Sequence, residues 1–148
     1  MGDFTVLRRI SRDTATVNAP SALALASYSE VRRQLELLST APETDEFGRV
    51  RPSNSAIAAA TRVTFSVVQA GLDMPMVEDV STDGDGAIRI LWAMAGRKLE
   101  LVCPFQPSQR FYWYYSDQES YRIEYEQSFE LLRRLVSWLN GRALHFPR

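Results

Sequence analysis

The residues best able to act as nucleophile or base are few and far apart. The chain has one cysteine, Cys103, and one histidine, His145. A Ser-His-Asp or Cys-His mechanism would depend on a histidine in the terminal tail. Cys103 falls on the inward phase of an expected strand, where a thiol is buried and unreactive. A zinc site needs several cysteine or histidine ligands. We therefore expect no catalytic residue, no metal site and no cofactor.

The run Asp83-Gly84-Asp85-Gly86 begins like a calcium-binding loop. Ala87 and Ile88 then stand where oxygen ligands would be needed, and no glutamate closes a twelve-residue loop. Aspartate alternating with glycine between two apolar runs is typical of a hairpin turn. Lys98-Leu99-Glu100 has the reverse order of a Glu-x-Lys nuclease motif, and the chain has no glycine-rich phosphate loop. The sequence thus predicts a turn at residues 83–86.

Aromatic residues gather at positions 111–115, in the order Phe-Tyr-Trp-Tyr-Tyr. On a strand, Tyr112 and Tyr114 would face away from the core, on the same side as Arg89 and Arg110. Tyrosine and arginine on an open sheet face are typical of protein interfaces. The same residues stack unpaired bases in sheet-based RNA-binding proteins, although this face has few basic residues. Cross-strand aromatic pairing would also explain them without any ligand.

Negative charge concentrates in the middle of the chain. Residues 41–85 carry three arginines and eight acidic residues, against a formal net charge of −1 for the whole chain. Three of the acids, Glu43, Asp45 and Glu46, share one loop. A solvated loop explains this pattern, and a surface for a basic partner is the alternative. The overall charge predicts no general affinity for nucleic acid or an anionic membrane.

The composition is that of a single globular domain. The 148 residues are 45% apolar and 24% charged, which is ordinary for a soluble protein of this size. A single cysteine excludes an intramolecular disulfide framework and fits a reducing compartment. The longest apolar run near the start is too short for a signal sequence or a membrane span. We expect a cytoplasmic protein.

Hydrophobic spacing divides the chain into an N-terminal arm (1–20), one α+β domain (21–141) and a C-terminal tail (142–148). The weak alternation of the arm fits either an edge strand or a mobile tail. Apolar residues three and four positions apart predict helices over 21–39, 53–70 and 125–140, with glycine following the last two. The expected inward residues are Leu25, Tyr28, Val31, Leu35 and Leu38 in the first helix; Ile57, Ala60, Thr64, Val67 and Val68 in the second; and Phe129, Leu132, Leu135, Val136 and Leu139 in the third.

Between the second and third helices the apolar period changes to two. Runs at 77–81, 87–95, 98–103 and 110–115, separated by turn residues, predict a four-stranded antiparallel meander. One turn is expected at Gly96-Arg97. The predicted fold is therefore α+β, with two N-terminal helices, the meander and a C-terminal helix. The face expected to be buried contains Ile88, Ile90, Trp92, Met94, Leu99, Leu101, Cys103, Phe111, Trp113 and Tyr115.

Several of these segments together resemble a widespread group of small, uncharacterised bacterial proteins. That group shares an Asp-Gly or Asn-Gly loop, a Pro-Ile-Ser-like helix start, a helix, a Leu-Pro-x-Pro segment, an Asp-Gly turn and an Ile-x-Leu-x-Trp strand. The matching segments here are residues 45–48, 51–53, 72–75 and 85–92, with the helix that ends near residue 70. The group's tryptophan before the first loop is missing, and its glycine-rich turn after the third strand is replaced by residues 104–109. The resemblance implies no activity and no catalytic residues.

The sequence favours a non-enzymatic protein–protein interaction module, such as an antitoxin-like, immunity-like or defence-associated accessory subunit. The expected partner is another bacterial protein or a second copy of the chain, and no membrane partner is expected. The alternative is a domain that binds a small ligand or single-stranded nucleic acid through the aromatic sheet face. The candidate binding residues are Arg89, Arg110, Tyr112 and Tyr114 on the sheet, and Glu43, Asp45 and Glu46 in the acidic loop.

Overall fold

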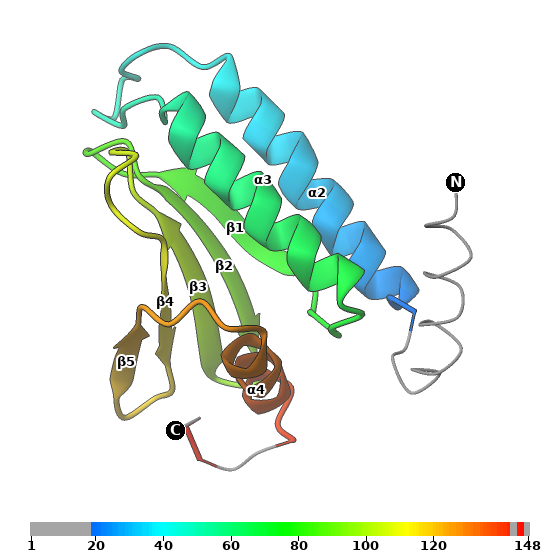
Figure 1. Cartoon of the computed structure of the whole chain (residues 1–148). Helices are drawn as coiled ribbons and strands as arrows, with labels where there is room; N and C mark the ends of the chain where they lie inside the picture. The colour runs from blue at the N-terminus through cyan, green and yellow to red at the C-terminus, as the bar shows by residue number, and fades with distance from the viewer. Residues whose placement is uncertain (1–18, 143–144, 147–148) are drawn as a thin grey trace.

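The computed structural model describes residues 19–142 and 145–146, so most of the N-terminal arm lies outside the described residues. The described part confirms an α+β fold with an antiparallel sheet (Figure 1). It contains three helices and five strands, one strand more than predicted. In chain order they are α2 (Ala22–Ser39), α3 (Asn54–Gln69), β1 (Val77–Thr82), β2 (Ile88–Met94), β3 (Arg97–Cys103), β4 (Tyr112–Ser116), β5 (Tyr121–Glu124) and α4 (Phe129–Leu139).

The sheet is a simple meander in the order β1-β2-β3-β4-β5, and the described helices pack on one of its faces (Figure 1). Helix α2 packs against α3 and β1, α3 against β2 and β3, and α4 against β3. One hydrophobic core joins these helices to the inward side chains of the strands. The opposite face of the sheet is covered by no described helix, and we call it the open face.

Each described helix begins at a serine whose hydroxyl accepts a backbone N–H three residues further on. This arrangement satisfies one of the donors that a helix leaves free at its start. The cap at Ser128 sets the start of α4 at Phe129, and not near residue 125 as predicted. Residues 121–124 belong to a strand. The capping bonds run to Ser21 from Ala24 (3.0 Å), to Ser53 from Ala56 (3.0 Å) and to Ser128 from Leu131 (3.1 Å).

Two helical residues expected to face inward are exposed. Leu25 on α2 is 46% exposed, and Phe129 at the start of α4 is 53% exposed. On α2 the buried positions include Ala24 and Ser27, which share a helical stripe with Val31. Small residues there allow α2 and α3 to approach closely, so the packing favours this stripe over the one that contains Leu25. Phe129 lies in the first turn of α4, where it lines a surface hollow.

The predicted inward face of the sheet is confirmed at its centre. Met94 is 39% exposed, because it lies at the end of β2 beside the turn. Phe111 precedes β4 and is only partly buried against the core. That turn consists of Ala95 and Gly96, with φ of 49° and 83°, and Met94 pairs with Arg97 across it. The turn predicted at Gly96-Arg97 is thus displaced by one residue. The inward residues with no more than 3% exposure are Ile88, Ile90, Trp92, Leu99, Leu101, Cys103, Trp113 and Tyr115.

Strand β5 was not predicted. It pairs antiparallel with β4 across a turn in which the Asp117 carboxylate accepts the N–H groups of Glu119 (2.8 Å) and Ser120 (2.9 Å). Its apolar residues, Tyr121 and Ile123, are exposed. A strand with no buried side chain lacks the burial signal from which the other strands were identified.

Strand β1 forms the other edge of the sheet and is irregular. Its pairing with β2 shifts between Val77 and Asp79, so Glu78 is an extra residue in a β-bulge. The side chains of Glu78 and Asp79 are exposed. The two edges of the sheet therefore differ, since β1 is bulged and acidic and β5 is regular.

We predict that Trp92→Ala destabilises the fold by about 3–5 kcal/mol, through lost burial and the cavity left behind. Trp92 is 3% exposed and its ring centroid lies 6.3 Å from that of Trp113. Urea unfolding at equilibrium would measure the loss. Leu91→Ala is the matched control, because Leu91 is the neighbouring residue on the open face and should cost far less. Equal losses for the two variants would contradict the assigned strand phase.

Candidate interaction surface on the open face of the sheet

Aromatic side chains cover the β4–β5 side of the open face. The ring centroids of Tyr114 and Tyr121 lie 5.5 Å apart with the rings stacked, and those of Tyr112 and Tyr125 lie 5.3 Å apart. Ile123 is paired with Tyr114 across the two strands. We call these five residues the tyrosine surface. Three of them are exposed: Tyr121 (63%), Ile123 (45%) and Tyr125 (56%).

Sequence reasoning found only part of this surface. Tyr112 and Tyr114 were identified from the phase of the 110–115 run, and both are half-buried on the open face. Tyr121, Ile123 and Tyr125 were missed because β5 was missed. The alternation Tyr-Arg-Ile-Glu-Tyr at 121–125 is the signal that could have revealed them.

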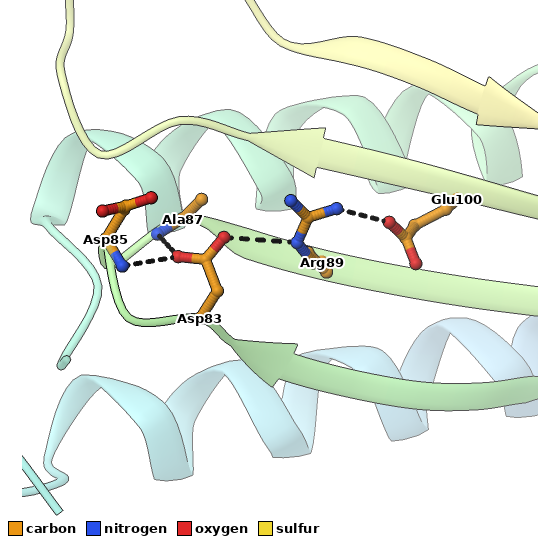
Figure 2. A network of polar contacts seen from close by, with 5 residues as sticks. All are labelled: Asp83, Asp85, Ala87, Arg89 and Glu100. Carbon is orange, nitrogen blue, oxygen red and sulfur yellow. Dashed lines mark hydrogen bonds and ion pairs between the residues drawn. The ribbon is translucent and has the colours of Figure 1, made fainter. Parts of the chain in front are cut away.

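Arg89 lies on β2 between two carboxylates, as Figure 2 shows. Its Nε donates to Asp83 Oδ2 (3.2 Å), and its Nη1 donates to Glu100 Oε1 (2.8 Å) on the adjacent strand. The two acids neutralise the charge of Arg89 and hold its side chain in one position. Arg89 therefore has a fixed position on the open face. Because its positive charge is balanced by the two acids, it has little attraction for a phosphate.

Asp83 organises the turn between β1 and β2. Its Oδ1 accepts the N–H groups of Asp85 (2.9 Å) and Ala87 (3.1 Å) (Figure 2). Partial burial acts to raise the pKa of Asp83, but these two N–H groups and Arg89 outweigh it and lower the pKa below 3.8. The predicted turn is confirmed, and the carboxylate that resembled a calcium ligand is satisfied by the protein itself.

Asp45, in the acidic loop, repeats the construction of the Asp83 turn. Its Oδ1 accepts the N–H groups of Phe47 (2.9 Å) and Arg49 (2.8 Å), and its Oδ2 accepts from Arg49 Nε (2.8 Å). These bonds, led by the Arg49 N–H, lower the pKa of Asp45. Gly48 and Gly86 hold the same position in the two turns, with φ of 78° and 77°.

This role leaves Asp45 little freedom to bind a partner. The side chains of Glu43 and Glu46 remain exposed, and Glu43 lies 3.8 Å from the guanidinium of Arg51. The loop is tied to the Asp83 turn by a hydrogen bond from Val50 N to Asp83 O (3.2 Å). The three acids predicted as one site thus divide into a structural residue and two solvent-facing ones.

Arg110 lies away from the tyrosine surface, in a hollow of about 360 Å³ between α3 and the 104–109 loop. Arg62 of α3 lines the same hollow, with serine and glutamine side chains and no acidic residue. A second hollow of about 450 Å³ shares Arg62, Phe111 and Gln127 with it and continues to Trp113 and α4. Among the arginines of residues 19–142, only Arg62 and Arg110 have no hydrogen-bond, ion-pair or aromatic-ring partner.

Cys103 is fully buried on the inward face of β3. Burial raises the pKa of its thiol to about 12, so the reactive thiolate is scarce at neutral pH. His145 is exposed. Within the described ranges, no group of three or more histidine, cysteine or acidic residues could hold a metal ion. None of the described helices has the length and apolar character needed to cross a membrane.

These features define an α+β protein with one helix-covered face and one open, tyrosine-rich face. Comparison with protein-family models, curated proteins and solved structures finds no match to this chain.

We predict that Asp83→Asn lowers the melting temperature at pH 7 and has a smaller effect near pH 3. Because the folded pKa of Asp83 is lowered, its carboxylate stabilises the protein above about pH 4, and this contribution is lost as the pH falls through the folded pKa. Thermal unfolding across this pH range would measure the difference. Asp85→Asn is the control, because Asp83 binds only the backbone N–H of Asp85. An effect of Asp83→Asn that is constant with pH would contradict the ion-pair role.

Proposed function

We propose that the protein is a non-enzymatic interaction module that binds another protein through the tyrosine surface. The observation that carries this proposal is the grouping of four tyrosines and Ile123 on one side of a sheet face that no described helix covers. Tyrosine offers a large contact area, a hydroxyl for hydrogen bonding and few rotatable bonds to immobilise. Strand β4, which carries two of these residues, has Trp113 and Tyr115 in the core, so little ordering of its backbone would be needed on binding.

The charges near the tyrosine surface favour a protein over a nucleic acid. Arg89 is paired with two acids, and the β4–β5 hairpin and the segment after it carry Glu119, Glu124 and Glu126. Proteins that bind single strands combine stacked aromatic residues with a positively charged groove. The aromatic residues are present here, but the positive groove is lacking around them.

A small domain of this kind fits the role of an antitoxin-like, immunity-like or defence-associated accessory subunit. Such a subunit acts by binding a partner protein. The partner would then be the product of a neighbouring gene. A toxin-like or effector-like neighbour would support this assignment, and that neighbour's protein is the first one to test for binding.

We predict that Tyr112→Ala and Tyr114→Ala each weaken binding to that protein by about 2 kcal/mol or more, roughly thirtyfold in Kd. Both residues lie outside the core, so the melting temperature should change little. Tyr28→Ala on α2 is the control, since Tyr28 is also half-buried but lies on the helical side. Isothermal titration calorimetry would measure the three affinities.

Normal binding by the Tyr112→Ala/Tyr114→Ala double variant would place the partner site elsewhere. Salt separates the nucleic-acid alternative from the proposal. Affinity for phosphates falls steeply between low and moderate salt, whereas an aromatic protein interface loses little.

A second candidate function, binding of a small organic anion, is favoured by the two joined hollows beside α3. Arg62 and Arg110 provide two unpartnered positive charges at one end, while Trp113 and Phe129 line the other. A pocket of this size with a few convergent polar groups suits a small molecule. The matching ligand is a carboxylate attached to an aromatic or branched apolar group.

We predict that Arg62→Gln and Arg110→Gln each weaken binding of 4-phenylbutyrate, used as a probe, by about tenfold, because each removes one charged contact to the carboxylate. Titration followed by NMR would detect the affinity and locate the shifted signals. Arg33→Gln is the control, since Arg33 is exposed on α2 and paired with Glu30. An affinity unchanged by both hollow variants, or no binding of the probe, would remove this candidate.

A further inference from the structure

The segment Tyr121-Arg122-Ile123-Glu124-Tyr125 is close to a palindrome. Tyrosine stands at both ends, isoleucine at the centre, and opposite charges at the two positions between. When two such segments pair antiparallel about Ile123, each tyrosine faces a tyrosine and each Arg122 faces a Glu124. Ile123 faces its own copy. Every cross-strand pair in this arrangement is favourable.

The segment lies where it can be paired. Within the described residues, β5 has β4 on one side and no strand on the other. The side chains of Tyr121, Arg122 and Ile123 are exposed. An edge strand of this kind presents unpaired backbone N–H and C=O groups that can bond to another strand.

The hydrogen-bonding phase of the β4–β5 pairing also leaves the right backbone groups free for a second copy. Asp117 N donates to Ser120 O (3.0 Å) at the base of the turn. Bonded and non-bonded pairs alternate in an antiparallel ladder, so the next bonded pairs are Tyr115 with Arg122 and Trp113 with Glu124. The backbone groups of Tyr121 and Ile123 therefore point away from β4. These are the groups that pairing centred on Ile123 would use.

Charge selects this register over its neighbours. A slip by two residues in one direction places Arg122 opposite Arg122 of the second copy, and a slip in the other direction places Glu124 opposite Glu124. Like charges directly opposite each other on neighbouring strands are destabilising. A slip by one residue would bring the tyrosine side of one copy against the charged side of the other.

Two intramolecular contacts hold these charges on the covered-face side of β5, where Arg122 is paired with Tyr115 and Glu124 with Trp113. The Arg122 guanidinium lies over the Phe146 ring, 5.1 Å from its centroid. Glu124 Oε1 accepts from Glu126 N (3.1 Å). Both side chains thus have a preferred position before any second copy binds, which lowers the entropy lost on pairing.

We propose that two copies of this chain pair through β5, about a two-fold axis at Ile123, to form one continuous antiparallel sheet. The tyrosine surfaces of the two copies then lie side by side on the joined open face. The inference rests on the proposed function for the use of this face, and it identifies a second copy as the partner along the edge. Strand pairing over about five residues buries little area, so the dimer should form in a concentration-dependent way.

The decisive experiment exchanges the two charges. Arg122→Glu and Glu124→Arg each place like charges opposite each other, and each should raise the dimer dissociation constant about tenfold or more. The double variant Arg122→Glu/Glu124→Arg restores opposite pairs, and its dissociation constant should return to within about threefold of the wild type. Sedimentation equilibrium on the purified full-length chain would measure all four constants.

Ile123→Pro tests the backbone part of the proposal. The Ile123 N–H points away from β4, so proline there should leave the melting temperature almost unchanged and abolish the dimer. A wild-type chain that stays monomeric up to about 1 mM would overturn the proposal. So would a dimer that neither the charge exchange nor Ile123→Pro affects.

This experiment needs no other protein, so its outcome is separate from that of the partner-binding test. Tyr112→Ala and Tyr114→Ala should leave the dimer intact, because both residues lie on β4 and not at the edge. A dimer without a separate protein partner would remove the proposed function and keep this inference. Partner binding by a chain that stays monomeric would support the proposed function and overturn this inference.

Discussion

Side chains on β2, β3 and β4 alternate between a covered face and an open face, and the remainder of the molecule is arranged around this alternation. The covered side carries Ile88, Ile90 and Trp92 on β2, with matching apolar residues on the next two strands. A slip of one residue in any of these strands would move that set into water. The same rule places Arg89, Tyr112 and Tyr114 on the opposite side. Burial on one face therefore determines the chemistry available on the other.

The features that could be predicted from the sequence are those that burial or capping imposes. Strict alternation over three strands identified the inward face, and serine at the start of an apolar stripe marked the helix that begins near residue 53. Strand β5 was missed because its apolar residues are exposed. The inward stripe of α2 was misjudged at Leu25, because adjacent stripes on a helix share residues and only the packing partner decides between them.

The acidic loop shows a different limit of prediction from composition. The composition of residues 41–85 indicated a charged surface, but it could not separate carboxylates that hold turns from those that face water. The repeated pattern Asp-x-x-Gly at Asp45 and Asp83 carries that distinction. In both turns the aspartate accepts backbone N–H groups two and four residues ahead, and a glycine with positive φ completes the turn. Local turn chemistry thus explains charges that overall composition presents as a binding site.

The bulge in β1 has a consequence for assembly. Sheets that can join at both edges add copies without limit and grow into fibres, whereas contacts about a two-fold axis close after two copies. The far edge of this sheet is interrupted at Glu78, and two acidic side chains project there. The β1 strand of a second copy would meet an interrupted hydrogen-bond ladder there. Its own acidic residues would also repel those of the first copy. In the proposed dimer, β5 would be the edge that pairs, and the bulged, acidic β1 would stop further copies from adding to the sheet.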